Sequence, residues 1–327
     1  MRAVLLTGHG GPDVLQPATV PDPEPGPGQV AVDLVRAALN HREVWIREGR
    51  PGPLPAILGS DGAGVVAEIG PGVEGVAVGD EVVVNPSLDW GPDEDEPGPD
   101  FRILGRPDQG TYAERIVLAA HQVRPRPAGW SWDECAALPL AGLTAWRALR
   151  LAGAASGRRI LVTGAGGGVA TFLVQIGAAL GATVVATTGS GTKVARALEL
   201  GATEAVDYHD PEWPRQIGQV DAAIDSIGGS GLDAVISTLV RGGVLVSFGD
   251  TSRETATVDL AEVFLEWRRI QGTTMGSPRE FDALLAHLET ADWRPVIDST
   301  FPLEEAAEAH RRLVNPERTG KVVLAIR

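Results

Sequence analysis

The sequence predicts an α/β protein built from a doubly wound parallel sheet and a second, antiparallel, barrel-like β domain. Three observations predict it. The chain has 327 residues, 43% of them apolar, which is enough for two hydrophobic cores. Its first third consists of short β-rich runs separated by Gly- and Pro-rich turns, a pattern typical of antiparallel barrels. From about residue 130, β-branched runs alternate with apolar helical runs, as in a parallel sheet covered by helices.

The expected elements follow from these patterns in chain order. In the first third, the predicted strands are 3–6, 29–39, 62–70, 80–84 and 112–118. In the second part, the predicted strands are 159–163, 183–188, 204–208, 220–225 and 243–249, with helices at 169–181, 193–201 and 232–240. A helical region is expected over 280–315, and a closing strand over 321–326 is expected to return to the N-terminal domain. The predicted domains are therefore 1–124 with 268–327, and 125–267.

Composition excludes several classes of protein. The formal net charge of -15 argues against nucleic-acid binding, because such a chain would repel a phosphate backbone. No apolar run is long enough to span a membrane, and the N-terminus lacks the pattern of a signal peptide, so we expect a cytoplasmic protein. The single cysteine, Cys135, excludes an internal disulfide and is expected to be buried and inert. Only Lys193 and Lys321 are lysines among the 28 cationic residues.

The stretch "RILVTGAGGGVATFLVQIGAALGA" carries the strongest functional signal. A predicted strand ends at Thr163, a glycine-rich turn follows, and an apolar helix begins near Val169. Glycines allow a tight turn and let backbone amides approach a pyrophosphate, which then lies at the positive end of the helix dipole. Gly-rich turns also occur for packing reasons, but this one opens a strand–helix–strand unit. The sequence therefore predicts dinucleotide binding.

The second strand of this unit indicates which dinucleotide. NAD binders usually place an acidic residue about 20 residues after the glycines, at the end of that strand, to hold the ribose 2′-hydroxyl. Here the strand runs into "TTGSGTK", which has no acid and instead offers Ser190 and Lys193. A hydroxyl and an ammonium suit a 2′-phosphate. The alternative is that Lys193 is only a solvated residue in the first turn of a helix. We expect NADP(H).

Taken together, the motifs resemble the medium-chain dehydrogenase/reductase superfamily over essentially the whole chain. The matching stretches include "LPAILGSDGAGVVAEIGPGVEGVAVGDEVVV", "GTYAERIVL", "AALPLAGLTAWRAL", "VTGAGGGVA" and "GKVVL". The resemblance implies a GroES-like domain joined to a Rossmann domain, an active site in the cleft between them, and a homodimer or homotetramer.

The resemblance also bears on metal content, because the family contains zinc-dependent alcohol dehydrogenases and zinc-free quinone or enone reductases. At the three positions where the zinc enzymes carry ligands, this chain has Asn40, Ser60 and Leu140. Asn and Ser bind Zn²⁺ poorly and Leu not at all. His41 lies beside the first position, and a site formed with Glu43 and Asp61 stays open as an alternative. The expected metal content is none, so the resemblance is to the zinc-free branch.

The same resemblance assigns the site residues. The residues implied to line the substrate pocket are Asn40, His41, Glu43 and Trp45, with His41 a candidate proton relay and no residue a convincing general acid. The residues implied to contact the nicotinamide, the pyrophosphate and the 2′-phosphate are Thr144, Gly167, Gly168, Val169, Ala170, Ser190, Lys193 and Tyr208. Two further glycines, Gly228 and Gly249, follow predicted strands at the edge of the sheet where cofactor contacts are expected.

The function expected from these residues is NADPH-dependent reduction of a small quinone or α,β-unsaturated carbonyl without a metal. Hydrogen bonds from the protein, with Asn40 as one donor, would polarise the substrate carbonyl. Two alternatives stay open: alcohol or aldehyde oxidoreduction within the same superfamily, and a non-catalytic NADPH-binding protein.

The acidic run "WGPDEDEPGPD", residues 90–100, lies where the resemblance places a cysteine-rich structural-zinc lobe in the zinc enzymes. It contains no cysteine, and its acids lack the spacing of a calcium loop. We expect a solvated, mobile loop.

Overall fold

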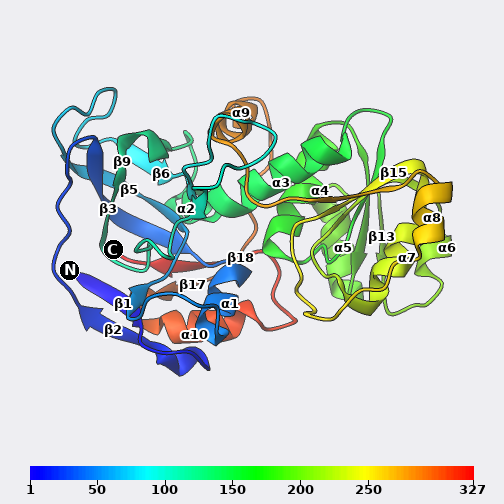
Figure 1. The fold of residues 1–327 in the computed structure, drawn as a ribbon, viewed down its shortest axis with the longest axis horizontal. Coiled ribbons are helices and arrows are strands. Elements are labelled where there is room, and N and C mark those ends of the chain that lie inside the picture. The colour runs from blue at the N-terminus through cyan, green and yellow to red at the C-terminus, as the bar shows by residue number, and fades with distance from the viewer. The chain divides into compact units, whose positions relative to one another are not determined.

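The computed structural model describes residues 1–327 and divides the chain into two compact units (Figure 1). Unit 1 comprises Met1–Ala141, Ser277–Thr290 and Arg294–Arg327, and unit 2 comprises Gly142–Gly276 and Ala291–Trp293. The fold is α/β, with mainly antiparallel strands in unit 1 and a parallel sheet in unit 2. None of the helices combines the length and apolar character that a membrane crossing requires.

Unit 1 is built mainly from strands. These are β1 (Arg2–Leu6), β2 (Leu15–Thr19), β3 (Gln29–Ala38), β4 (Ala56–Ile57), β5 (Asp61–Ile69), β6 (Glu81–Val84), β7 (Ser87–Leu88), β8 (Arg102–Ile103), β9 (Arg115–Ala119), β10 (Val123–Pro125), β17 (Ile297–Pro302) and β18 (Lys321–Ala325). Its helices are α1 (His41–Glu48), α2 (Trp132–Ala137), α9 (Pro278–Leu288) and α10 (Ala306–Leu313). The largest sheet has the order β10-β6-β5-β3-β18-β17, and β9 also pairs with β3.

The C-terminal strand lies in the sheet of the N-terminal domain. β18 pairs antiparallel with β3, with Val323 opposite Ala38, which confirms the prediction that the last strand returns to this unit. β17 pairs parallel with β18, so the expectation of a purely helical region over 280–315 is wrong. The run of residues 297–302 includes Asp298 and Pro302, which mask its strand character in the sequence.

The unit boundaries lie later in the chain than the sequence suggested. The first falls at Ala141 instead of 124, because α2 packs on β3 and β5 of unit 1. The second falls at Gly276 instead of 267, because β16 (Arg269–Gly272) pairs with β15 (Leu239–Ser247) in the sheet of unit 2. Helix packing therefore sets the first limit and strand pairing the second, and the local sequence pattern reveals neither.

Unit 2 is a six-stranded parallel sheet with helices packed on it (Figure 1). Its remaining strands are β11 (Arg159–Val162), β12 (Thr183–Thr188), β13 (Glu204–Asp207) and β14 (Val220–Asp225). Its helices are α3 (Pro139–Ala152, which begins in unit 1), α4 (Gly168–Ala179), α5 (Gly191–Glu199), α6 (Trp213–Ile217), α7 (Leu232–Ser237) and α8 (Leu260–Leu265). The order β13-β12-β11-β14-β15-β16 is that of a doubly wound dinucleotide-binding sheet, with α4 packed on β11 and β12.

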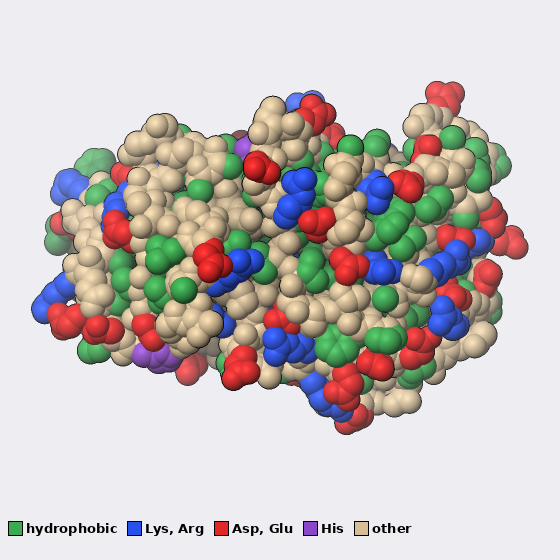
Figure 2. Space-filling view, turned by 180° about the vertical axis from the view of Figure 1, so that it is seen from behind, with side chains coloured by type: hydrophobic (Ala, Val, Ile, Leu, Met, Phe, Trp, Pro, Cys, Tyr) green, Lys and Arg blue, Asp and Glu red, His purple; other side chains and the backbone are tan.

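The surface carries its charges intermixed. On the face shown in Figure 2, acidic side chains lie beside arginines, with apolar patches between them. Several arginines of the chain form ion pairs, such as Arg115 with Asp33 at 2.7 Å.

The core of unit 1 contains a buried histidine, and we predict that it makes stability depend on pH. His310 is fully buried beside Tyr112, and burial lowers the pKa of His310 to about 3. In the unfolded chain this imidazole takes up a proton below about pH 6.5, whereas in the folded protein it stays neutral down to about pH 3. The free energy of unfolding therefore falls as the pH drops from 6.5 toward 3. Between pH 7 and 5 the loss from this group is about 2 kcal/mol. Denaturant titrations at several pH values should show that the free energy of unfolding of His310→Gln falls less below pH 6.5 than that of the wild type. The control His121→Gln, at an exposed histidine, should show the same pH dependence as the wild type.

Candidate functional site

The candidate substrate-binding residues of unit 1 lie where β3 gives way to α1. Asn40 precedes the first turn of α1, and its backbone N–H donates to Oε2 of Glu43 at 2.6 Å. This is an Asn-x-x-Glu helix start, in which the acid three residues into the helix satisfies a backbone donor. Glu43, predicted to be a pocket acid, therefore has a local role in forming this helix that its family position does not reveal.

A buried ion pair lies directly beneath the start of α1. The Lys321 ammonium contacts Oδ2 of Asp61 at 2.9 Å and Oδ1 of Asn40 at 2.5 Å. Asp61 is completely buried, Lys321 nearly so, and the second carboxylate oxygen of Asp61 accepts the Leu140 N–H at 2.7 Å. The Asn40 amide also donates to Asp61 at 2.9 Å. This cluster joins the start of β18, the start of β5, the start of α1 and the beginning of α3.

Glu43 belongs to the same buried network and does not reach the surface of the site. Its exposed fraction is 0%, and its Oε1 accepts the hydroxyl of Ser60 at 2.7 Å. Burial raises the pKa of Glu43, while the Arg42 guanidinium at 3.5 Å opposes that rise. Glu43 therefore holds α1 and Ser60 in place and is not positioned to touch a substrate.

His41 and Trp45 are the members of this group that are only half-buried. Their rings meet edge to face with centroids 5.5 Å apart, one turn apart on α1. The guanidinium of Arg50, just past the end of the helix, lies over the Trp45 ring at 4.9 Å. A half-buried imidazole, an indole and a guanidinium thus border the outer side of the buried network.

The three positions assigned to metal ligands by resemblance are brought together by the fold. Asn40 and the backbone of Leu140 bind Asp61, and Ser60 binds Glu43, which lies in the same network. No group of three His, Cys, Asp or Glu side chains in the chain is arranged to hold a metal ion. An ammonium group, that of Lys321, is the cation at this place. The sequence singled out Lys321 only by its rarity.

The glycine-rich turn of unit 2 has the form that a pyrophosphate requires. β11 ends at Val162, and α4 begins at Gly168 with Gly167 as its N-cap. A Cβ at Gly166 would stand 3.1 Å from Nζ of Lys193, so the lysine side chain already lies against this turn. Val169 and Ala170 form the first turn of α4, and their backbone N–H groups point toward the helix N-terminus. Backbone donors and an ammonium therefore converge at one end of the sheet.

The predicted 2′-phosphate residues also meet, at the end of β12. Ser190 caps α5 by accepting the Lys193 N–H at 3.4 Å. The Tyr208 hydroxyl lies against Gly189, where a Cβ would stand 2.5 Å from it. The structure therefore brings Ser190, Lys193 and Tyr208 around one turn that carries no acidic side chain, as the sequence pattern suggested.

A side chain at Gly189 is expected to weaken cofactor binding. Gly189→Ala would push the Tyr208 ring away from the turn, because the added methyl group overlaps the hydroxyl. We expect a severalfold to tenfold rise in the KM for the dinucleotide cofactor. Gly191→Ala is the matched control, since nothing lies within 4 Å of its Cβ position. Equal KM values for the two variants would contradict the assignment of this turn.

The loops after β14 and β15 lie at the carboxyl-terminal edge of the parallel sheet of unit 2, where cofactor contacts are expected. Asp225 accepts the Thr163 hydroxyl at 2.6 Å and the Gly228 N–H at 2.8 Å, which fixes the loop after β14. Gly249 follows β15, and its Cβ position is 3.2 Å from Ser226. Thr144 is buried in α3. Each of these residues belongs to unit 2.

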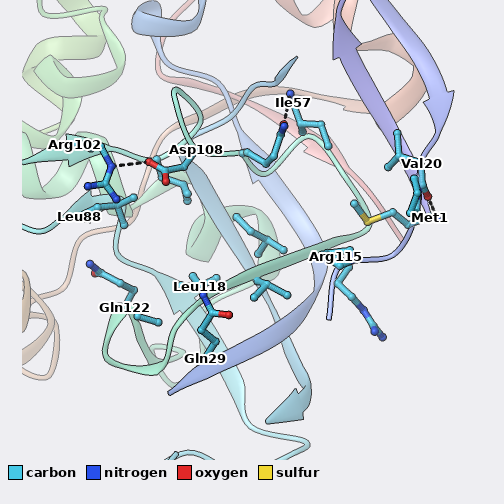
Figure 3. Close-up of a pocket in the computed structure, with 18 of the residues that line it drawn as sticks. Met1, Val20, Gln29, Ile57, Leu88, Arg102, Asp108, Arg115, Leu118 and Gln122 are labelled. Atoms are coloured by element: carbon cyan, nitrogen blue, oxygen red, sulfur yellow. Dashed lines mark hydrogen bonds and ion pairs between the residues drawn. The ribbon is translucent and has the colours of Figure 1, made fainter. Parts of the chain in front are cut away.

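A separate cavity of about 640 Å³ lies in unit 1 (Figure 3). Its apolar wall includes Ile57, Leu88 and Leu118, and Arg102 pairs with Asp108 at 3.0 Å on its border. None of the residues assigned to substrate or cofactor lines it.

The acidic run 90–100 is anchored by its tryptophan. Trp90 is buried against Phe101, and its ring N–H donates to the Asp93 carbonyl at 2.7 Å. Most of the carboxylates in the run are exposed. Elsewhere, Cys135 is buried as predicted, and burial raises the pKa of its thiol to about 12, so no thiolate forms at neutral pH.

Comparison with known proteins adds to this geometry. Residues 26–128 match the family described as alcohol dehydrogenase GroES-like domain, and residues 200–324 match the family described as zinc-binding dehydrogenase. A zinc-type alcohol dehydrogenase-like protein of Schizosaccharomyces pombe is 32% identical, covering 100% of this chain and 99% of its own. A quinone oxidoreductase of Pseudomonas aeruginosa is 31% identical over 99% of each chain. The crystal structure of an NAD-dependent alcohol dehydrogenase is 42% identical, with a TM-score of 0.96 over 100% of both chains.

Proposed function

Because the chain belongs to the medium-chain dehydrogenase/reductase superfamily, we propose that it is an NADPH-dependent reductase that transfers a hydride to a quinone or α,β-unsaturated carbonyl without a metal. Oxidoreductase activity and a nicotinamide cofactor follow from its relatives. What we propose beyond this is that the cofactor is NADPH, that the acceptor is a quinone or an α,β-unsaturated carbonyl, and that no metal takes part.

The observation that carries the metal-free proposal is the Lys321 ammonium 2.5 Å from Oδ1 of Asn40. A Zn²⁺ ion bound at Asn40 would lie beside a buried positive charge, which raises the cost of binding it. The neighbouring carboxylates are not free to act as zinc ligands. Both oxygens of Asp61 and both of Glu43 already accept hydrogen bonds from the protein.

The preference for NADPH is supported by the turn at the end of β12. The ammonium of Lys193, the hydroxyl of Ser190 and the phenol of Tyr208 offer one charge and two hydrogen-bonding groups to a 2′-phosphate. No acidic side chain stands at the end of β12 to accept a hydrogen bond from a ribose 2′-hydroxyl. In this respect we expect the chain to differ from its NAD-dependent structural neighbour.

In the proposed reaction a bound nicotinamide cofactor supplies the hydride. Asn40 has one amide N–H committed to Asp61, which leaves its second N–H to donate to the substrate carbonyl and stabilise developing negative charge. Asp61 and Lys321 fix the orientation of that amide by binding both of its ends. His41, half-buried at the start of α1, is the proton relay in this proposal.

A second candidate function is alcohol oxidation, since relatives carry that name. The buried network argues against it, because forming an alkoxide needs a Lewis acid or a strong base. The discriminating experiment is a steady-state assay of purified enzyme. NADPH oxidation should proceed with 1,2-naphthoquinone or an aliphatic enone, and NADP⁺ reduction with short alcohols should be much slower. Tight NADPH binding with no turnover of any acceptor would favour a non-catalytic role.

A further inference from the structure

Arg106 is a buried cation that the protein itself leaves without a partner. Only 7% of the residue is exposed, and none of its three guanidinium nitrogens has a hydrogen-bond partner. Burial lowers the pKa of Arg106, and no carboxylate offsets that effect. An unpaired buried guanidinium costs several kcal/mol, so a structure that keeps one usually has a counter-ion for it.

The neighbouring acceptors are already taken by a second arginine. The Arg42 guanidinium donates to the carbonyl oxygens of Ile103, Leu104 and Arg106 itself at 3.0–3.1 Å. It also donates to the Ser60 hydroxyl at 3.0 Å. Arg42 therefore braces the segment that carries Arg106 through three of its backbone carbonyl groups. The side chain of Arg106 is left facing a place with no internal acceptor.

This guanidinium lies beside the segment that follows α1. A Cβ at Gly52 would stand 2.8 Å from Cζ of Arg106, so the backbone of Gly52 covers the charged group directly. The covering residues 50–55 are exposed along their whole length. Arg50, in the same segment, lies over the Trp45 ring and is close enough to help lower the pKa of Arg42. Three guanidinium groups thus gather next to the half-buried face of α1, in a chain whose net charge is -15.

We propose that the acceptor substrate carries an oxyanion group, a carboxylate or a phosphate, and that Arg106 binds it. This inference rests on the proposed function, because it names the class of substrate for the same site. A guanidinium presents a planar fork of donors that matches two oxygens of one carboxylate or phosphate. The exposed segment 50–55 moves aside to admit the anion, and Gly52 makes that close approach possible. The substrate class becomes an acidic enone in place of a neutral quinone.

The test combines turnover with binding in the intact enzyme. Turnover is compared between (E)-4-oxopent-2-enoate and neutral (E)-3-penten-2-one, each with NADPH. Binding is measured by calorimetry in the presence of NADP⁺ with two unreactive probes, 4-oxopentanoate and inorganic phosphate. The variants are Arg106→Met, Arg106→Lys and Gly52→Ala. Arg102→Met is the matched control, because Arg102 lies nearby but is paired with Asp89 and Asp108.

We expect the wild type to favour the carboxylated enone by roughly 30-fold or more in kcat/KM, chiefly through KM. Arg106→Met should abolish that preference, chiefly by raising the KM for the carboxylated enone. Arg106→Lys should retain part of the preference for the carboxylated enone, since lysine keeps the positive charge but lacks the paired donors of the guanidinium group. Gly52→Ala should resemble Arg106→Met, because the added methyl group displaces the guanidinium. Arg102→Met should behave as the wild type.

The melting temperature separates an arginine that binds a ligand from one that only stabilises the fold. Removing an unpaired buried charge should leave the melting temperature of Arg106→Met equal to or above that of the wild type. An Arg106-dependent binding of phosphate but not of 4-oxopentanoate would identify a phosphorylated acceptor. Binding of either probe without turnover of any enone would support the anion site and contradict the proposed function. An unchanged enone preference in Arg106→Met, with neither probe bound, would overturn the inference.

Discussion

Asp61→Asn is expected to lower the free energy of unfolding by about 3–5 kcal/mol. The carboxylate of Asp61 is the sole counter-charge within 3 Å of the Lys321 ammonium, and both groups are buried. An asparagine of the same shape would leave that ammonium unpaired. It would also lose the charged acceptor for the Leu140 N–H and the Asn40 amide. Urea denaturation followed by tryptophan fluorescence measures the loss.

Two further variants separate the ion pair from general damage to the core. The double variant Asp61→Leu with Lys321→Met removes both charges and should recover most of the lost stability, because the penalty comes from leaving one charge alone. Asp33→Asn breaks a partly exposed pair with Arg115 and should cost about 1 kcal/mol or less. If Asp61→Asn costs no more than Asp33→Asn, the buried pair does not hold the site together.

Lys193→Ala is expected to reduce kcat/KM for NADPH by about 10- to 100-fold while changing the value for NADH by less than threefold. The lysine lies against Gly166 and next to Ser190, so its ammonium is placed to meet the phosphate that distinguishes the two cofactors. The loss should appear mainly in KM and should shrink at high salt, because an ion contact at a partly open site is screened. Steady-state assays with both cofactors at two ionic strengths provide the measurement.

The matched control for this prediction is Arg196→Ala. Arg196 lies on the same helix, α5, but pairs with Glu199 at 2.8 Å on the surface. Its removal should leave the ratio of NADPH to NADH efficiency unchanged. A parallel loss with both cofactors in Lys193→Ala would mean that the lysine acts on the shared part of the dinucleotide instead of on the 2′-phosphate.

The cofactor edge could be predicted because its signals are local in sequence. Strand, glycine turn and helix follow one another between residues 159 and 181, and Ser190 and Lys193 stand three residues apart. The resemblance to the superfamily implied that Tyr208 lies near Ser190, and in the structure the pairing of β12 with β13 brings Tyr208 to the end of β12. The backbone pairing of β12 with β13 fixes the relative positions of these residues.

The buried network of unit 1 could not be predicted in the same way. Lys321 contacts Asn40 across 281 residues of sequence, and only the register of β18 on β3 brings them together. Glu43 was read as a pocket acid because chemistry and helix capping use the same residue type. The unpaired state of Arg106 likewise depends on Arg42 taking the nearby carbonyl groups, which no local pattern reveals.

Metal content and turnover measured on the same enzyme sample show directly whether the reduction needs a metal. Protein treated with a chelator and then dialysed is analysed by inductively coupled plasma mass spectrometry and assayed for NADPH oxidation with an enone acceptor. Metal-free catalysis predicts full activity at substoichiometric metal, and no gain when Zn²⁺ is added back. Loss of activity on chelation that Zn²⁺ restores, with one ion bound per chain, would contradict it.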